Sequence, residues 1–492
     1  MAGTDQKLDA DVIVVGGGNA GFSAAHAAAT RGRKVILLER GTDEMAGGNS
    51  YYTAGATRIV HDGLEDLQKF IEHDDRHDRS EVPPYTIEDY RSDMERVTEG
   101  RTDKDLMEVL IKESRPTLEW LHSLGLKYRL MYERQAYERE DGGFLFWGGL
   151  HVGNVGGGEG LIADHTRVAK ELGTDIRYGH RARRLIVEDG KVVGVVAEVD
   201  GQEVELRAES VIMTAGGFEA SPELRAKYMG EAWKNAKVRG TPYNVGDMIE
   251  AALQIGAAPG GDFTTCHSIQ WDAEHPQNDS NRELTNRLSR QSYPLGILVN
   301  KEGKRFLDEG ADYRNYTYAK YGKVVLEQPD AFAYQVFDAD LRPMVRKEDY
   351  EMPGVSVHEA DTLEELADKI QVDKDAFLKT VKDYNENINE DAEYDPNTLD
   401  GRSSNVTPPK SHWAQALDRG PFYAYPVTCG ITFTFGGVKT DTHGRVLNES
   451  GEHIEGLYAA GEMLGGLFSI NYPGGAGLAA GMTFGRRAGS LA

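Results

Sequence analysis

The chain begins with a short apolar segment that runs directly into a glycine-rich turn. Residues 11–21 read DVIVVGGGNAG, an Ala-rich helical stretch follows, and a second apolar run at residues 35–38 ends on Glu39. This order of strand, turn, helix, strand and acid is the complete βαβ pattern that holds a dinucleotide pyrophosphate at a helix N-terminus. The alternative is an ordinary tight turn between a strand and a helix.

Each part of this pattern has a distinct physical role. Gly16 allows the tight turn, Gly18 lets the backbone approach a pyrophosphate, and Gly21 lets the helix pack on the strand. Glu39 lies where a carboxylate would bind the ribose hydroxyl groups. The residues predicted to contact the nucleotide here are Gly16, Gly18, Asn19, Ala20, Gly21, Glu39 and Arg40.

Length and charge limit the classes of partner. A chain of 492 residues can bury a large core and should form more than one domain. The net charge of −25, from 80 acidic and 55 basic residues, disfavours nucleic acid and anionic lipid as partners. It does not exclude an anionic substrate, because a local arginine cluster can override the global field.

The cysteine content and the hydropathy of the chain exclude several kinds of metal site and a membrane-spanning segment. The chain has only Cys266 and Cys429, which are far apart and rule out a disulfide framework, a CxxC zinc site, an iron–sulphur set and a CxxCH haem site. No apolar run approaches the length of a membrane span, and residues 1–10 do not resemble a signal peptide. We therefore expect a cytoplasmic protein without a metal site, whose redox chemistry would need an organic cofactor and a separate electron acceptor.

The arrangement of motifs along the chain predicts a split domain. Residues 183–213 contain three alternating apolar runs, separated by Asp-Gly pairs at 189–190 and 200–201 that suit hairpin turns. Residues from about 263 to 432 differ in composition, since they are rich in aromatic residues and in part in arginine. Gly-rich motifs like those of the N-terminal region return in the C-terminal tail. We therefore expect a second domain to be inserted into the first.

Five segments, taken in order, resemble a known family. They are VIVVGGGNAG, GGNSYYTAGA (47–56), VIMTAGGF (211–218), NKEGKRF (300–306) and LYAAGE (457–462). Together they resemble the fumarate reductase/succinate dehydrogenase flavoprotein superfamily, most closely the tricarballylate dehydrogenase-type enzymes, with 3-ketosteroid Δ1-dehydrogenases as relatives. The resemblance implies an α/β fold: a Rossmann-like FAD-binding domain at 1–262 and 433–492, and an inserted α+β substrate-capping domain at 263–432.

The resemblance also implies where FAD would be contacted. The GGNS segment would meet the pyrophosphate and ribityl region, Glu462 the ribityl hydroxyls, and the start of the last helix the flavin N1–O2 edge. Because SYYTAG lacks the histidine that carries covalent FAD in succinate dehydrogenases, we expect FAD to be bound non-covalently. The implied positions are Gly47, Gly48, Asn49, Ser50, Ala54, Gly55, Ala182, Asp247, Glu462, Gly477 and Leu478.

On the substrate side, the resemblance points to three residues. Arg314 matches the arginine that serves fumarate reductases as proton donor, although an arginine is a poor acid and could instead clamp a carboxylate. His267 matches a histidine that binds the substrate carboxylate, although a lone histidine is more often structural. Tyr472 stands in NYPGG, where fumarate reductases carry an arginine and ketosteroid dehydrogenases have a comparable YPG segment.

Departures from the fumarate reductase pattern bear on the substrate. Residues 432–434 read Thr-Phe-Thr where those enzymes carry a histidine, and Tyr472 replaces their second carboxylate-binding arginine. These changes argue against fumarate or succinate and are compatible with a tricarballylate-type or ketone substrate. Arg58, Arg290 and Tyr316 are weaker candidates for anion contacts.

The predicted activity is dehydrogenation of a CH–CH bond next to a carboxylate or carbonyl, with hydride transfer to flavin N5. Tricarballylate giving cis-aconitate is the first substrate hypothesis, and the alternatives are a ketone Δ1-desaturase or an enoate reductase. A flavin-bearing electron-transfer subunit is the rival from another class. The acceptor could be a quinone, oxygen or, as the resemblance implies, a membrane iron–sulphur partner.

Overall fold

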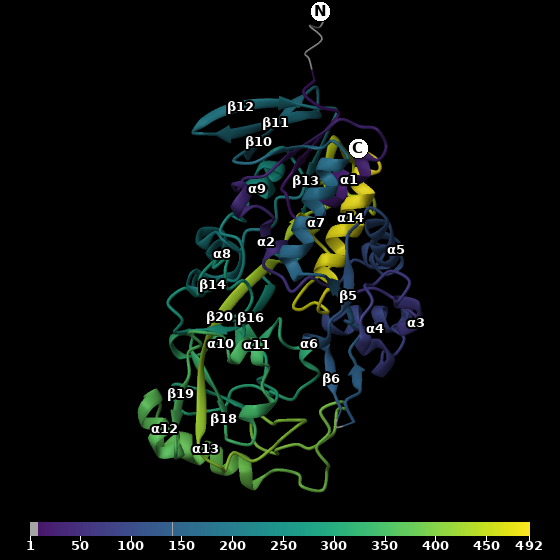
Figure 1. Cartoon of the computed structure of the whole chain (residues 1–492). Helices are drawn as coiled ribbons and strands as arrows, with labels where there is room; N and C mark the ends of the chain where they lie inside the picture. Colours follow the sequence, from purple (N-terminus) through teal and green to yellow (C-terminus); the bar gives the residue numbers. More distant parts are fainter. Residues whose placement is uncertain (1–7, 140) are drawn as a thin grey trace, which may run out of the picture. The chain divides into compact units, whose positions relative to one another are not determined.

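The computed structural model describes residues 8–139 and 141–492 (Figure 1). The chain forms two compact units: a first made of Met1–Met229, Thr241–Cys266 and Phe433–Ala492, and a second made of Gly230–Gly240 and His267–Thr432. The division predicted above at 262/263 and 432/433 stays a prediction. The units differ from it by placing residues 230–240 in the second unit and residues 263–266 in the first. Within the described ranges, no helix has the length and apolar character needed to span a membrane.

A six-stranded sheet forms the centre of the first unit. Its order is β22-β23-β13-β1-β2-β9, and all neighbours run parallel except the antiparallel edge pair β22–β23. All four residues of β1 are buried, which explains why its sequence is continuously apolar rather than alternating. The strands are β1 Val12–Val15, β2 Val35–Leu38, β9 Asp175–Arg177, β13 Ser210–Met213, β22 Arg445–Leu447 and β23 His453–Ala459.

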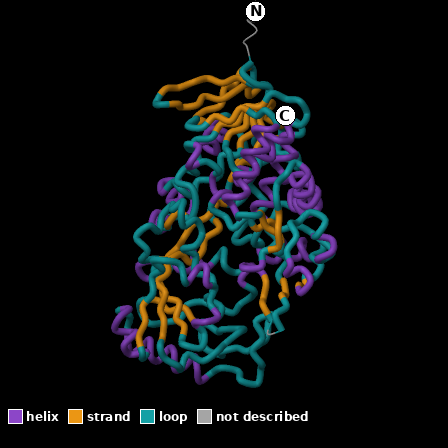
Figure 2. The backbone as a smooth tube through the Cα atoms, in the orientation of Figure 1, coloured by secondary structure: helices purple, strands orange, loops and turns teal. Residues whose placement is uncertain are grey.

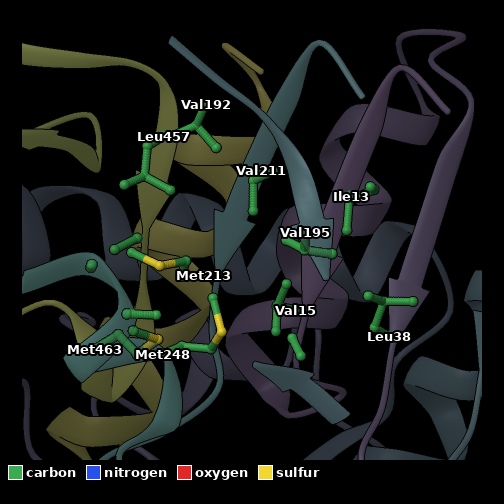
Figure 3. Packing of buried hydrophobic residues seen from close by; sticks show 14 of the residues in the cluster. Ile13, Val15, Leu38, Val192, Val195, Val211, Met213, Met248, Leu457 and Met463 are labelled. Atoms are coloured by element: carbon green, nitrogen blue, oxygen red, sulfur yellow. The ribbon is translucent and has the colours of Figure 1, made fainter. Parts of the chain in front are cut away.

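The two faces of this sheet bury different partners. Ile13 and Val15 face a core that includes Val195 of a three-stranded antiparallel sheet (Figure 3), whereas Val12 and Val14 face helix α1. That antiparallel sheet consists of β10 Arg181–Glu188, β11 Lys191–Val199 and β12 Gln202–Arg207. Its two hairpins turn at the Asp-Gly pairs with positive φ at all four residues, which confirms the hairpins predicted there.

Helix α1 (Asn19–Ala29) packs closely against the last helix, α14 (Ala476–Gly489), with α7 (Gly157–Glu171) on its other flank and α5 (Lys104–Ser123) against α14 (Figure 1, Figure 2). Glycines make the close approach possible. A Cβ atom on Gly485 would lie 2.3 Å from the Ala20 carbonyl oxygen, and one on Gly489 would lie 2.1 Å from that of Ala24. The two ends of the chain are therefore joined by backbone-to-backbone helix contact.

The second unit is built on another mixed sheet. Its path is β14-β20-β18-β17, with β16 and β19 also paired to the long strand β20. Helices α12 (Leu363–Ile370) and α13 (Lys374–Glu386) contribute to the buried core on this sheet. The strands are β14 Lys237–Val238, β16 Cys266–Asp272, β17 Ile297–Asn300, β18 Ala333–Phe337, β19 His358–Ala360 and β20 Phe422–Thr434.

The α1–α14 contact makes a quantitative prediction. Gly485→Ala should lower the free energy of unfolding of the FAD-free protein by roughly 1–3 kcal/mol, because the new methyl group overlaps a backbone carbonyl that cannot move freely. The matched control is Gly477→Ala on the same helix, whose added Cβ meets nothing closer than 3.7 Å. That control should be neutral or slightly stabilising. Equal urea midpoints for the two variants would contradict the explanation.

Candidate functional site

The glycine-rich turn after β1 has the geometry that its sequence predicted. Gly16 has φ of 110°, and a Cβ there would lie 2.4 Å from the Thr214 carbonyl oxygen. A Cβ on Gly21 would lie 1.9 Å from the Gly16 carbonyl oxygen, so helix and turn touch directly. At Gly18 the closest atom would be Ser50 Oγ at 3.4 Å. Protein packing therefore demands glycine at the first and third positions, while the second keeps its surface open for a ligand.

The backbone beside this turn offers unused donors. In the ranges that the structure describes, the N–H groups of Gly18, Ala20 and Gly48 have no hydrogen-bond acceptor. Gly48 begins the short helix α2 (Gly48–Tyr51), which is tied to α1 by the Asn19 N–H donating to Ser50 Oγ at 3.0 Å. Two helix starts thus present N–H groups in one place, as an anionic pyrophosphate requires.

Glu39 closes the nucleotide motif from the end of β2. Its two carboxylate oxygens accept the N–H groups of Gly17 and Gly41 at 3.0 and 2.7 Å. The next residue, Arg40, lies 3.5 Å from Asp247, which also binds Arg181 at 2.7 Å. The structure therefore brings Glu39, Arg40, Asp247 and the strand that carries Ala182 to one region, where the resemblance places the adenosine half of FAD.

A buried chain of hydrogen bonds links α1 to the start of α14. Asn19 Nδ2 donates to the Leu478 carbonyl at 2.8 Å, so Asn19 Oδ1 is the acceptor for His165 Nε2 at 3.0 Å. His165 Nδ1 must then accept from His26 Nε2, also at 3.0 Å. Burial holds the pKa of His165 well below its usual value and lowers that of His26 to about 3. The chain therefore consists of neutral rings with fixed tautomers.

The N-terminus of α14 is held by a buried arginine. Gly475 caps the helix with φ of 81°, and Arg58 Nε donates to the preceding Gly474 carbonyl at 2.8 Å. The Arg58 guanidinium is fully buried, pairs with Asp93 at 3.3 Å and also binds Tyr85. Arg58 is therefore a structural residue in this turn, and we withdraw it as a candidate anion contact.

The first turn of α14 fits a negatively polarised ligand. Among the described residues, the N–H groups of Gly477 and Leu478 have no hydrogen-bond acceptor. Both residues are partly exposed at the helix start, where the macrodipole favours negative charge. Their predicted place at the flavin N1–O2 edge stays a prediction.

Aromatic side chains surround Tyr472 beside this helix start. The Tyr472 ring meets Phe433 edge-on at 5.1 Å and Phe468 at 5.6 Å between centroids. Phe435 extends the cluster. A Cβ on Gly477 would lie 3.7 to 3.8 Å from the Phe433 and Tyr472 rings. The predicted flavin-facing turn is therefore bordered by an apolar, aromatic wall.

The remaining flavin positions of the first unit are also engaged by neighbours. Gly55 has φ of 77° and approaches the Gly157 backbone so closely that a Cβ would lie 2.9 Å from it, with Ala54 alongside. Asn49 binds Glu219, and Glu462 Oε1 accepts from both the N–H and the hydroxyl of Thr434. These contacts fix the side chains that the resemblance assigns to the ribityl region.

In the second unit, Arg314 and His267 have different surroundings. Arg314 begins the short helical turn Arg314–Tyr316 and donates to Gln291 Oε1 at 2.9 Å; Arg346 donates to the same oxygen at 2.8 Å. His267 is fully buried on β16, edge-on to Tyr318. Burial and the charge of Arg239 hold the pKa of His267 well below its usual value, so a neutral ring is expected there.

Two other arginines of the second unit are structural. Arg290 is fully buried and pairs with Asp272 at 2.5 Å, so we also withdraw it as an anion contact. Arg305 of the NKEGKRF segment pairs with buried Glu309. Tyr316 is buried in the turn that carries Arg314.

Comparison with known proteins identifies the family. The family model described as "FAD binding domain" matches residues 11–478. The chain belongs to this family. A probable fumarate reductase of Shewanella frigidimarina is 31% identical over 495 residues, covering 98% of this chain and 74% of the relative. A 3-oxosteroid 1-dehydrogenase of Mycolicibacterium smegmatis is 30% identical over 364 residues, covering 69% of this chain and 63% of the relative.

A solved structure agrees with this assignment. The open conformation of a flavocytochrome c3 fumarate reductase superposes with a TM-score of 0.73 at 28% identity, covering 99% of this chain and 78% of that chain. The predicted fold class, a FAD-binding domain with a cap domain, is thereby confirmed. The protein is an FAD-dependent oxidoreductase of the fumarate reductase and steroid dehydrogenase type, and the predicted cofactor FAD is confirmed.

Several residues with buried or partly buried polar contacts were not predicted from the sequence. No motif indicated the contacts of Glu219, Asn244, Gln291 and Arg346. A signal existed for Glu219, since a glutamate directly after the Gly-Gly-Phe that follows a buried strand has few places to reach solvent. Gln291 and Arg346 are 55 positions apart and gave no such signal.

The neutral histidine chain predicts a pH dependence of stability. His26 has a folded pKa of about 3 against an ordinary value of 6.5, so below pH 6.5 only the unfolded chain takes up the proton. The free energy of unfolding should therefore fall from pH 7 to pH 5, with His26 contributing roughly 2 kcal/mol. Urea titrations of His26→Gln should show a decrease smaller by that amount. The control His73→Gln, at a side chain 84% exposed, should keep the parental decrease.

Proposed function

We propose that this oxidoreductase dehydrogenates, or in reverse forms, a CH–CH bond next to the carbonyl group of a substrate with an apolar body. The observation that carries the proposal is the wall of Phe433, Phe468 and Tyr472 beside the start of α14. Aromatic rings favour an apolar substrate surface, whereas a small polyanion gains nothing from them and loses hydration.

The proposed roles of the residues follow from their chemistry. The Tyr472 hydroxyl would donate to the substrate carbonyl oxygen and so acidify the adjacent C–H bond. Arg314 would either move the proton or bind a negative charge, and its high ordinary pKa favours binding. FAD, when bound, supplies the acceptor or donor of two electrons. The N–H groups of Gly477 and Leu478 would stabilise negative charge at its edge.

The relatives support a reaction at a CH–CH bond. One is named a 3-oxosteroid 1-dehydrogenase and another a probable fumarate reductase. On this basis we propose a ketone-type substrate first, in the desaturating direction, with reduction of an enoate as the reverse use of the same scaffold.

A carboxylate substrate is the second candidate, with tricarballylate giving cis-aconitate as its specific form. The guanidinium groups of Arg314 and Arg346 both donate to one oxygen atom, Gln291 Oε1. A third positive side chain, Arg239, lies near His267. This concentration of positive charge favours a carboxylate substrate. Glu348 and Asp349 already neutralise Arg346, which weakens this case. Non-covalent FAD, a cytoplasmic location and a separate acceptor (quinone, oxygen or an iron–sulphur partner) complete the proposal.

Substrate class can be measured directly from the flavin colour. The holoprotein should bleach anaerobically with 3-oxosteroids or substituted cyclohexanones, and more slowly with succinate or tricarballylate. The reduced protein should be reoxidised by the matching enones. If tricarballylate bleaches the flavin and ketones do not, the carboxylate candidate replaces the first one.

The variant Tyr472→Phe tests the proposed role of the Tyr472 hydroxyl group. With a ketone substrate, kcat should fall about a hundredfold while KM changes little, because the hydrogen bond strengthens as charge develops on the carbonyl oxygen. Phe433→Leu is the matched control for the wall, and it should raise KM while largely preserving kcat. If Tyr472→Phe reduces flavin at the parental rate, the tyrosine has no part in the reaction.

A further inference from the structure

Two acidic side chains meet in the interior of the first unit. Glu219 follows β13 in the segment GGFEA and is fully buried. Glu462 lies in the turn Gly461–Met463 after β23. Their carboxyl groups are close enough to hydrogen-bond to each other. The family resemblance gives Glu462 a role at the ribityl chain but gives none to Glu219.

The surrounding donors are distributed unevenly over the four oxygens. Glu219 Oε1 accepts from Asn49 Nδ2 and Asn244 Nδ2, each at 2.6 Å. Glu219 Oε2 is buried and has no partner among the ordinary donors of the described residues. Glu462 Oε1 accepts from the Thr434 N–H at 2.7 Å and from its hydroxyl at 3.1 Å.

No positive charge compensates the pair. Within residues 8–139 and 141–492, neither carboxyl group forms an ion pair with a lysine, arginine or histidine. Two ionised carboxylates in contact and out of water repel each other strongly, so such pairs retain one proton. Burial raises the pKa of both groups.

We infer that Glu219 and Glu462 share one proton at Glu219 Oε2, so that the pair carries a single negative charge. A proton between the two carboxyl groups supplies the buried Oε2 atom with the partner that it otherwise lacks.

The consequence concerns the cofactor rather than the substrate. Glu219 is a positioning residue that aims the Glu462 carboxylate, fixed on its other side by Thr434, at the FAD ribityl hydroxyls. A second negative charge at this place would disfavour the anionic reduced flavin, so the shared proton also sets how strongly the protein prefers the reduced form. This inference stands independently of which substrate is used.

The test compares isosteric variants of the holoprotein. In Glu219→Gln the amide oxygen can still accept from both asparagines, and the NH2 group can still donate to Glu462. We expect this variant to bind oxidised and reduced FAD within about twofold of the parent. Glu219→Leu removes the acceptor and the donor together and should weaken FAD binding about tenfold or more. The double variant Glu219→Gln/Glu462→Gln removes the one charge and should shift the ratio of reduced to oxidised FAD affinity about tenfold toward the reduced form.

Infrared spectroscopy detects the proton itself and does not depend on activity. At neutral pH the parent should show the C=O band of a protonated carboxylic acid, and Glu219→Gln should lose it. The control Glu223→Gln, at an exposed position on the next helix, should keep it. Absence of the band from the parent overturns the inference. So does a Glu219→Gln variant whose affinity ratio shifts toward the reduced form as far as that of the double variant, because both glutamates would then be charged in the parent.

Discussion

The direct backbone contact between α1 and α14 is the constraint on which the flavin unit depends. Glycines 485 and 489 let α14 come against the carbonyl groups of Ala20 and Ala24. The bond from Asn19 to the Leu478 carbonyl then fixes the two helix starts relative to each other. As a result, two sets of unused N–H groups, encoded more than 450 residues apart, are held by one rigid helix pair. One set suits the pyrophosphate and the other suits the isoalloxazine edge.

The interior of this unit holds many titratable groups with little net charge. The histidines of the α1–α7 contact are neutral, Arg58 is balanced by Asp93, and the proton that we infer leaves Glu219 and Glu462 with one negative charge between them. Each arrangement satisfies hydrogen bonds while limiting the charge that is held out of water. The glutamate pair is then the buried group whose charge would act on the flavin.

The parts of the fold that depend on local backbone geometry could be predicted from the sequence. The βαβ turn, the two Asp-Gly hairpins and the inserted cap fold follow from glycine positions, turn residues and segment order. The pairing of polar side chains in the folded chain could not be predicted in this way. Arg58 and Arg290 looked available for anions because sequence shows neither their burial nor Asp93 and Asp272. Glu219 was missed because its partners Asn49, Asn244 and Glu462 come from three separate segments.

The division between the two units falls within strand β20, between Thr432 and Phe433. Residues 432–434 of this strand each contact a different side chain. Thr432 accepts from Arg239, Phe433 packs on Tyr472, and Thr434 binds Glu462. Because side chains alternate along a strand, the two threonines share one face and the phenylalanine occupies the opposite one. The aromatic position can therefore vary while the contacts of the two threonines stay in place. An insertion or deletion of one residue in this run would exchange the faces and break the contacts of Thr432, Phe433 and Thr434 together.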